Sequence, residues 1–168
     1  VTLLMNGQEK FDDLFQAIRQ AKKSVHLEYF NFRNDSIAGL LFDLLAEKAK
    51  QGVKVRALYD GFGNSSNNKP LRKRHIKEIR ANGIEIYEYK PVKFPWVHAI
   101  FNRDHRKIVV IDGQIAYTGG INVADYYIKG TEVVGSWNDM HCRIDGDEEN
   151  TLQAIFLKMW NKVSGQHI

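Results

Sequence analysis

The residues best suited to chemistry lie in one stretch of the chain. His105 and Lys107 are separated by one residue and precede an apolar, β-branched run, residues 108–111, of the kind that forms a buried strand. Side chains two positions apart on a strand point to the same face, so the imidazole and the ammonium group are expected to lie side by side. A nucleophile or acid beside a cation suits a phosphate group.

The residues that follow complete a hairpin. Asp112 begins an Asp-Gly turn, and residues 114–118 have the pattern of the return strand. Gly119 and Gly120 then allow a ligand to approach the backbone closely, and Asn122 adds a neutral amide donor. The hairpin and the residues just beyond it therefore predict a phosphate-binding site.

The complete pattern resembles the signature of the phospholipase D superfamily. That signature is histidine, any residue, lysine, four residues and aspartate, followed by Gly-Gly or Gly-Ser and an asparagine. Every position is occupied in this chain, by His105, Lys107, Asp112, Gly119, Gly120 and Asn122. The surroundings, including Trp-Asn-Asp-Met-His at 137–141, are most similar to the first catalytic half of bacterial cardiolipin synthases, and the similarity runs from Phe11 to Trp160.

The resemblance implies roles for these residues. His105 would attack phosphorus and carry the group as a phosphohistidine, while Lys107 and Asn122 would contact the nonbridging oxygens. A lone histidine is more often a surface residue, but the full signature favours the nucleophile. An imidazole with an unperturbed pKa of about 6.5 is mostly neutral at pH 7, as a nucleophile requires. The resemblance implies a reaction without a metal or a cofactor, and the sequence has no short Cys or His spacing of the zinc type.

Two aspartates are candidates for the acid that orients the imidazole. Asp112 belongs to the signature, but it lies five positions after Lys107, the wrong parity for the same strand face. Its turn position favours a carboxylate that binds local backbone. Asp139 corresponds to an acidic residue that takes the orienting role in related members of the superfamily, and it is the preferred candidate. The alternative for Asp139 is a surface acid at the start of a strand.

Glu28 is a carboxylate within an otherwise apolar strand pattern. A buried carboxylate must be paired or hydrogen-bonded. Glu28 is therefore expected either to support the site and its substrate or to bind an arginine or lysine across the sheet.

Periodicity predicts the elements that position these residues. The predicted helices cover residues 12–23, 36–51, 71–81 and 147–163, and the predicted strands cover 24–32, 53–59, 84–89, 108–111, 114–118 and 139–144. Residues 61–70 are expected to form a polar loop. The buried stripe of the second helix is expected to be Leu40, Leu41, Leu44 and Leu45. Alternating strands and helices imply parallel crossovers, so the expected fold is α/β, with a mixed, mostly parallel central sheet flanked by helices.

Length and composition limit the number of domains and the classes of partner. The 168 residues suit a single phospholipase D-like domain with one motif, spanning 1–168. A net charge of +4 favours an anionic partner, and the lone Cys142 excludes an internal disulfide framework. No apolar run reaches the length of a membrane span, and no signal-peptide pattern opens the chain. Because the chain begins at Val1, we expect a piece of a longer protein.

Two segments suit contact with a membrane. Residues 94–101 are rich in aromatic side chains and could form an apolar lip, although a core-packing loop is the commoner meaning. The helix over residues 71–81 is strongly basic and could contact anionic headgroups or nucleic-acid phosphates, although such a face is by default simply solvated.

The resemblance implies phosphatidyl transfer of the cardiolipin synthase type, through a phosphohistidine, to an alcohol acceptor such as phosphatidylglycerol. Hydrolysis of a phospholipid or nucleic acid is the alternative reaction, and a non-catalytic lipid-binding fragment is the alternative class. The expected partners are anionic phospholipid, a membrane surface on the cytoplasmic side, and a second phospholipase D-like half or a homodimer. Nucleic acid is less favoured.

Overall fold

The computed structural model describes residues 1–92, 101–133, 135–146 and 149–168. Within these ranges seven strands form one sheet in the order β1-β7-β6-β5-β2-β3-β4. The strands are β1 (Thr2–Leu4), β2 (Ser24–Tyr29), β3 (Lys54–Asp60), β4 (Glu85–Tyr89), β5 (Ile108–Ile111), β6 (Ile115–Gly119) and β7 (His141–Asp145). The helices are α1 (Gly7–Gln20), α2 (Ser36–Lys50), α3 (Gly61–Ser65), α4 (Lys73–Ala81), α5 (Tyr126–Lys129) and α6 (Glu149–Ser164).

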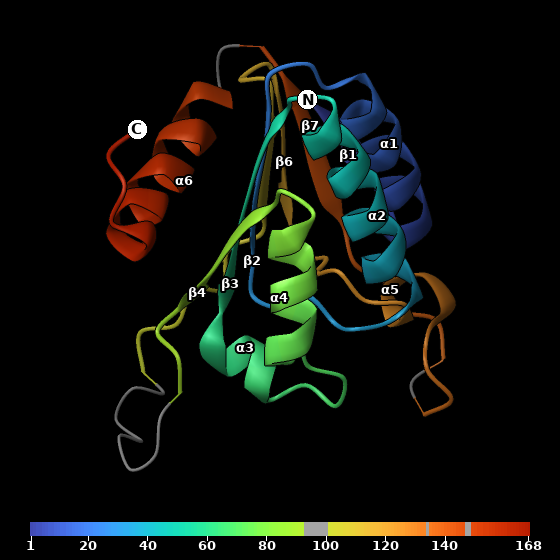
Figure 1. The fold of residues 1–168 in the computed structure, drawn as a ribbon. Coiled ribbons are helices and arrows are strands. Elements are labelled where there is room, and N and C mark those ends of the chain that lie inside the picture. The colour runs from blue at the N-terminus through green and yellow to red at the C-terminus, as the bar shows by residue number, and fades with distance from the viewer. Residues whose placement is uncertain (93–100, 134, 147–148) are drawn as a thin grey trace.

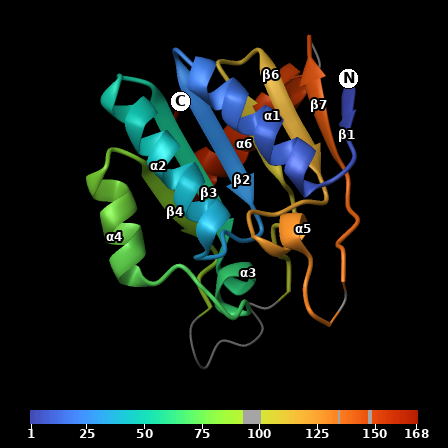
Figure 2. The same ribbon diagram turned by 90° about the vertical axis from the view of Figure 1, so that its right-hand side faces the viewer.

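The elements form three layers. Helices α1, α2 and α4 cover one face of the sheet, and α6 lies on the other (Figure 1). Figure 2 shows α1, α2 and α4 in front of the strands and α6 behind them. This is the α/β architecture with a mixed central sheet flanked by helices that the alternating pattern predicted.

The balance of strand directions differs from the prediction. Strands β2, β3 and β4 are parallel, joined through helices as expected. The pairs β2–β5, β5–β6, β6–β7 and β1–β7 are antiparallel, so the described sheet is not mostly parallel. Hydrophobic periodicity identifies strands but not their neighbours, and a turn as short as the three residues between β5 and β6 can join only antiparallel strands.

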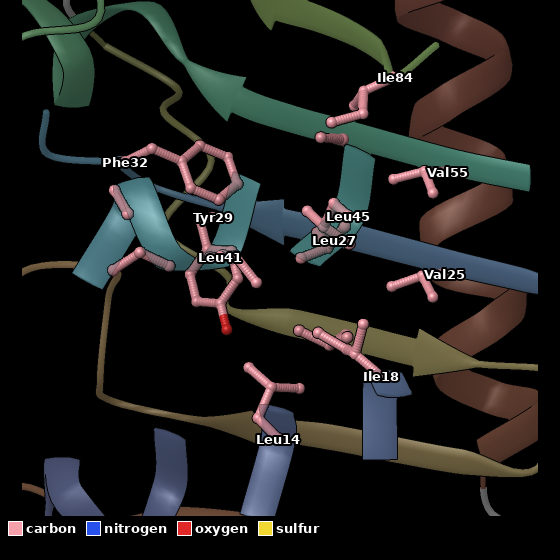
Figure 3. Close-up of a cluster of buried hydrophobic side chains, with 14 of the residues drawn as sticks. Leu14, Ile18, Val25, Leu27, Tyr29, Phe32, Leu41, Leu45, Val55 and Ile84 are labelled. Carbon is pink, nitrogen blue, oxygen red and sulfur yellow. The ribbon is translucent and has the colours of Figure 1, made fainter. Parts of the chain in front are cut away.

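The main core lies between the sheet and helices α1 and α2 (Figure 3). Leu14 and Ile18 from α1 face the odd-numbered residues of β2, because alternate strand side chains point to one face. Each fully buried aliphatic side chain contributes about 1.5–3 kcal/mol. The predicted stripe of α2 is partly wrong: Leu41 and Leu45 are buried, whereas Leu40 is 59% exposed.

Several element boundaries differ from those predicted, because local side-chain contacts decide them. Helix α1 begins five residues early, since the side chain of Asn6 accepts a hydrogen bond from Glu9 N and caps it. Part of the predicted polar loop is helix α3, because Asp60 Oδ1 accepts from Phe62 N and Gly63 N. Neither β1 nor α5 was predicted, and residues 147–148 of the last predicted helix lie outside the described part.

One edge of the sheet collects the candidate site residues. Strand β5 runs antiparallel to β2, with Ile108 paired to Glu28, so the start of β5 lies at the carboxyl end of β2. Helices α3 and α5 lie at the same edge, at the lower end of the molecule in Figure 1. The predicted apolar lip lies outside the described residues except for Phe101, which is 74% exposed. No helix of the described ranges is long and apolar enough to span a membrane.

Candidate active site

His105 and Lys107 lie together immediately before β5. The Nζ atom of Lys107 is 2.8 Å from Nδ1 of His105, and it donates a hydrogen bond of 2.6 Å to the His105 carbonyl oxygen. The lysine side chain is buried and the histidine is exposed. The structure therefore places the two groups side by side, as their spacing predicted.

Electrostatics favour a neutral imidazole beside a cation. Partial burial and the charge of Lys107 lower the pKa of His105, against the opposing effects of Asp104 and Asp60. Burial also lowers the pKa of Lys107, which Asp139 and Asp104 oppose. A lowered pKa keeps the imidazole unprotonated at neutral pH, and a neutral imidazole has one ring nitrogen that carries a lone pair.

Two neighbours that the sequence did not indicate hold His105 in place. The ring of Phe30 lies 4.6 Å from the imidazole, centroid to centroid. The fully buried Asp60 accepts a hydrogen bond of 2.9 Å from Asp104 N while its other oxygen caps α3. The end of β3 thus fixes the backbone next to His105. The sequence did contain a signal for Asp60. An acidic residue directly after an apolar parallel strand lies at the carboxyl ends of the strands, where binding sites form.

Gly119 and Gly120 have a packing role that their sequence pattern did not specify. A Cβ atom on Gly119 would lie 2.6 Å from the Cα atom of His141, and one on Gly120 would collide with the carboxylate of Asp139. The two glycines let the segment before β7 approach the site closely. The space next to these glycines, where a ligand was expected, is therefore occupied by atoms of Asp139 and His141.

The charge of Asp139 acts on the ammonium group of Lys107. The Oδ1 atom of Asp139 accepts a hydrogen bond of 2.8 Å from Met140 N, and its charge raises the pKa of Lys107. Within the described residues no hydrogen bond joins Asp139 to His105. The predicted orienting role of Asp139 remains a prediction, and the interaction that the structure provides is the effect of its charge on Lys107.

Asn122 is positioned from two sides. Phe32, just after β2, forms a bridge with Val123, and Arg33 N donates to the Val123 carbonyl oxygen at 2.9 Å. The amide Nδ2 of Asn122 donates to the Tyr127 hydroxyl at 3.0 Å, and its Oδ1 atom is buried without a partner in the described part of the chain. The second N–H of the amide is left for another acceptor.

Asp112 lies at the other end of β5 from His105. Its carboxylate accepts three backbone hydrogen bonds of 2.7–2.8 Å, from Lys22, Lys23 and Ser24. These bonds outweigh burial and lower the pKa of Asp112. The residue has the structural role that its turn position favoured, but it binds backbone 90 residues away in sequence rather than local backbone. This placement gives it no contact with the reacting groups.

Glu28 pairs with an arginine, which was the second of its two expected roles. It is fully buried, and its Oε1 atom lies 2.8 Å from Nε of Arg106, which also donates to Asp104 Oδ1 at 2.9 Å. Burial, followed by a hydrogen bond with Asp104, raises the pKa of Glu28 to about 9. The positive charge of Arg106 opposes this rise in pKa.

A second buried polar group lies beneath the site. His141 is fully buried, with Nδ1 accepting a hydrogen bond of 3.4 Å from Ile121 N. Burial lowers its pKa to about 2, and the charges of Lys10 and Lys107 add to this effect. Lys10 is also fully buried and donates to the Tyr29 hydroxyl visible in Figure 3. The neutral His141 therefore supports the backbone between the two glycines and Asn122.

Comparisons with known proteins agree with this geometry. The family model of the cardiolipin synthase, phospholipase D-like domain matches residues 14–160. A probable cardiolipin synthase of Bacillus subtilis, YwiE, is 39% identical over 99% of the chain, and a cardiolipin synthase of Staphylococcus aureus is 44% identical over 93%. The chain spans about a third of the length of these curated relatives, 33% and 31% respectively.

A solved structure supports the fold independently. NucT from Helicobacter pylori superposes with a TM-score of 0.72, covering 96% of each chain at 18% identity. Such low identity shows a shared fold and no more. Together, the family match over most of the chain and the paired His105 and Lys107 place this chain in the family of phospholipase D-like domains of cardiolipin synthases.

Proposed function

We propose that this chain forms one half of the active site of a phosphatidyltransferase of the cardiolipin synthase type. The observation that carries the proposal is the contact of 2.8 Å between the Lys107 ammonium and the His105 imidazole, in a chain about 40% identical to cardiolipin synthases. The substrate class is an anionic phospholipid such as phosphatidylglycerol.

In the first step a ring nitrogen of His105 attacks the phosphorus of the donor lipid. A bond between nitrogen and phosphorus forms, and the bond from phosphorus to the oxygen of the headgroup glycerol breaks. The departing glycerol oxygen takes up a proton. Lys107 moves its hydrogen bond from the imidazole to a nonbridging oxygen, which frees the lone pair that its contact with His105 occupies. The free N–H of the Asn122 amide is the second donor to these oxygens. Such donors stabilise charge that develops in the transition state.

In the second step the hydroxyl of an acceptor alcohol attacks the same phosphorus. The bond between nitrogen and phosphorus breaks, the hydroxyl proton leaves, and neutral His105 is regenerated. If the acceptor is phosphatidylglycerol, the product carries two phosphatidyl groups on one glycerol. Dividing the displacement into two steps is what covalent catalysis provides.

The proton donor for the leaving oxygen must come from outside this motif. Among the other histidines, His75 alone has a lysine two positions later, but Asn82 stands where the motif requires an aspartate. His75 and Lys77 also lie on helix α4, where residues two apart do not face each other, so the chain carries a single complete motif. We propose a second phospholipase D-like half as the source, from the rest of a longer chain or from a second copy in a homodimer. A general acid opposite the nucleophile is required to release an alkoxide.

The lipid substrate requires contact with a membrane surface, which we place on the cytoplasmic side. Support comes from the exposed basic side chains of and before α4, namely Arg72, Lys73, Arg74 and Lys77, and from the exposed Phe101. The start of α4 follows α3 at the same sheet edge as His105, so a headgroup bound there is near the site.

The proposal is tested with the full-length protein in mixed micelles of detergent and phosphatidylglycerol. We expect cardiolipin to form from phosphatidylglycerol alone and its formation to cease in His105→Asn, whose unfolding temperature should match that of the wild type. Release of phosphatidic acid without cardiolipin would indicate hydrolysis in place of transfer. Cleavage of DNA at a comparable rate would favour a nuclease.

A further inference from the structure

A pocket of about 370 Å³ adjoins His105 on the α6 side of the sheet. Among the described residues, its lining comes from the end of β4, the segment before β5, and α6. The lining residues are Tyr89, Arg103, Asp104, His105, Arg106 and Met159. Neither the signature nor the proposed mechanism assigns a role to this pocket, yet the proposed nucleophile borders it.

Arg106 is held so that its guanidinium points outward. Its Nε atom is fixed by Asp104 Oδ1 at 2.9 Å and lies 2.8 Å from Glu28 Oε1, and both of these carboxyl side chains are buried. The arginine side chain is 41% exposed, and neither terminal nitrogen has a hydrogen-bond partner among the described residues. A guanidinium anchored at Nε presents its two terminal N–H groups as a fork, which matches two oxygens of a phosphate.

The local charge permits an anion to bind there. Burial raises the pKa of Glu28 to about 9, which favours its neutral form and reduces the negative charge beside Arg106. Burial would lower the pKa of Arg106, but the hydrogen bond with Asp104 outweighs it and keeps the pKa above its ordinary value, so the guanidinium is charged. Arg103 adds a second guanidinium to the lining, with Nη1 donating to the Lys90 carbonyl oxygen at 2.8 Å.

The pocket beside Arg106 is distinct from the surroundings of the Lys107 ammonium, which contacts the phosphate of the donor lipid in the proposed mechanism. Lys107 has the parity of Val109 and Ile111, which pack in the core against α1 and α2. Arg106 has the parity of Ile108 and Val110, which pack against residues of α6. The guanidinium of Arg106 contacts Asp104 and Glu28, whereas the ammonium of Lys107 contacts His105, so the two cations have different neighbours.

We propose that this pocket binds a second phosphodiester anion, that of the acceptor lipid, with Arg106 as its bidentate ligand. The inference rests on the proposed transfer reaction and adds the place of the acceptor. A phosphatidylglycerol acceptor carries its own phosphate, three carbons from the hydroxyl that attacks. Binding that phosphate beside His105 places the hydroxyl near the phosphohistidine, and it favours phosphatidylglycerol over water or a simple alcohol.

The test compares two acceptors in the full-length protein. Cardiolipin formation from phosphatidylglycerol needs an acceptor with a phosphate, whereas incorporation of radiolabelled glycerol into phosphatidylglycerol needs the same donor and an acceptor without one. In Arg106→Gln we expect the amount of phosphatidylglycerol required for half-maximal cardiolipin formation to rise at least 10-fold. Glycerol incorporation at saturating donor should stay within about 2-fold, because a charged bidentate contact is lost from the acceptor alone.

Matched variants separate this effect from changes in charge or folding. Arg19→Gln removes the same charge from an exposed residue of α1, so it should leave both reactions unchanged. Arg106→Lys keeps a cation beside Asp104 but lacks the fork, so it should show the same selective loss. Because Arg106→Lys is expected to fold even if Arg106→Gln does not, it alone can decide the question.

Inorganic phosphate distinguishes a lipid headgroup from a free anion as the occupant. Millimolar phosphate should compete with the phosphatidylglycerol acceptor in the wild type and spare glycerol incorporation. Equal inhibition of both reactions, abolished in Arg106→Gln, would assign the pocket to free phosphate and overturn the acceptor role. Equal loss of both reactions in Arg106→Lys, or none, would also overturn it. Wild-type protein that makes no cardiolipin would instead refute the proposed function.

Discussion

At the scale of single residues, the site depends on one lysine close to one histidine. Lys107 lies 2.8 Å from the imidazole and lowers the pKa of His105, which keeps the nucleophile neutral. The same ammonium is available to a phosphate oxygen once a substrate arrives. In the proposed mechanism one residue therefore both keeps the imidazole neutral and neutralises the phosphate that it attacks.

The first prediction concerns this coupling. Lys107→Met removes the charge but keeps the side-chain volume, so the pKa of His105 should rise towards its ordinary value of about 6.5. Fewer imidazoles would then be neutral at pH 6 than in the wild type. NMR titration of the histidine ring protons measures the change. An unaltered or lower pKa of His105 in this variant would show that the lysine does not control it.

The second prediction separates the two aspartates. Asp112→Asn should lower stability by about 1–3 kcal/mol at pH 7, because the lost charge weakens three backbone hydrogen bonds. The lowered pKa of Asp112 means that its contribution is present above the unfolded pKa and disappears as pH falls through the folded one, so the difference from wild type should close in acid. Asp139→Asn should slow turnover with little change in the melting temperature.

Paired thermal and kinetic measurements on the two variants decide the assignment. A destabilised Asp139→Asn with normal turnover, together with a stable but inactive Asp112→Asn, would reverse the roles of the two aspartates.

The residues that could be predicted from the sequence were those that lie close together along the chain. The pair His105 and Lys107 follows from strand parity, and Asn122 from its distance beyond the hairpin. Asp60 was missed because its partner, Asp104 N, lies 44 residues away and depends on how the strands are ordered. The outward fork of Arg106 was missed for the same reason, since Glu28 anchors it across the sheet.

At the scale of elements, the periodicities identified most helices and strands but not their pairing. The parallel unit from β2 to β4 was predicted because each crossover contains a helix. The place of β5 beside β2 leaves no mark in local patterning, although it brings Glu28 next to the signature. The short elements β1, α3 and α5 were also missed, because capping and tertiary pairing form them rather than a repeating apolar pattern.

The third prediction concerns the basic face at α4. Replacing Arg72, Arg74 and Lys77 by Gln should weaken binding to vesicles of phosphatidylglycerol about 100-fold, because each cation near an anionic surface contributes about 1 kcal/mol. Binding should also weaken as salt rises. Replacing the exposed Lys22, Lys23 and Lys50 by Gln is the matched control, with the same change in charge. Vesicle flotation with equal losses in both triple variants would show that net charge, not this face, controls binding.

At the scale of the whole molecule, the described sheet presents one complete motif at one edge. A second catalytic group must face His105 to protonate the leaving oxygen, and the chain spans about a third of its curated relatives' length. A twofold dimer with its axis beside the site would place two copies of His105 opposite each other, and isologous contacts are the commonest in homo-oligomers.

The fourth prediction is that the 168-residue chain is inactive as a monomer. Sedimentation and phosphodiesterase assays at matched dilutions should show specific activity falling in proportion to the loss of dimer. Full specific activity in a sample shown to be monomeric would establish that one motif suffices.

Whether His105 carries the phosphatidyl group is decided by trapping that intermediate. The full-length protein is mixed with phosphatidylglycerol for a single turnover, denatured at alkaline pH to preserve the bond between nitrogen and phosphorus, and digested for mass spectrometry. We predict a phosphatidyl adduct on the peptide that contains His105, absent from His105→Asn and slower to form in Asp139→Asn. An adduct on any other residue, or one that persists in His105→Asn, would show that His105 is not the nucleophile.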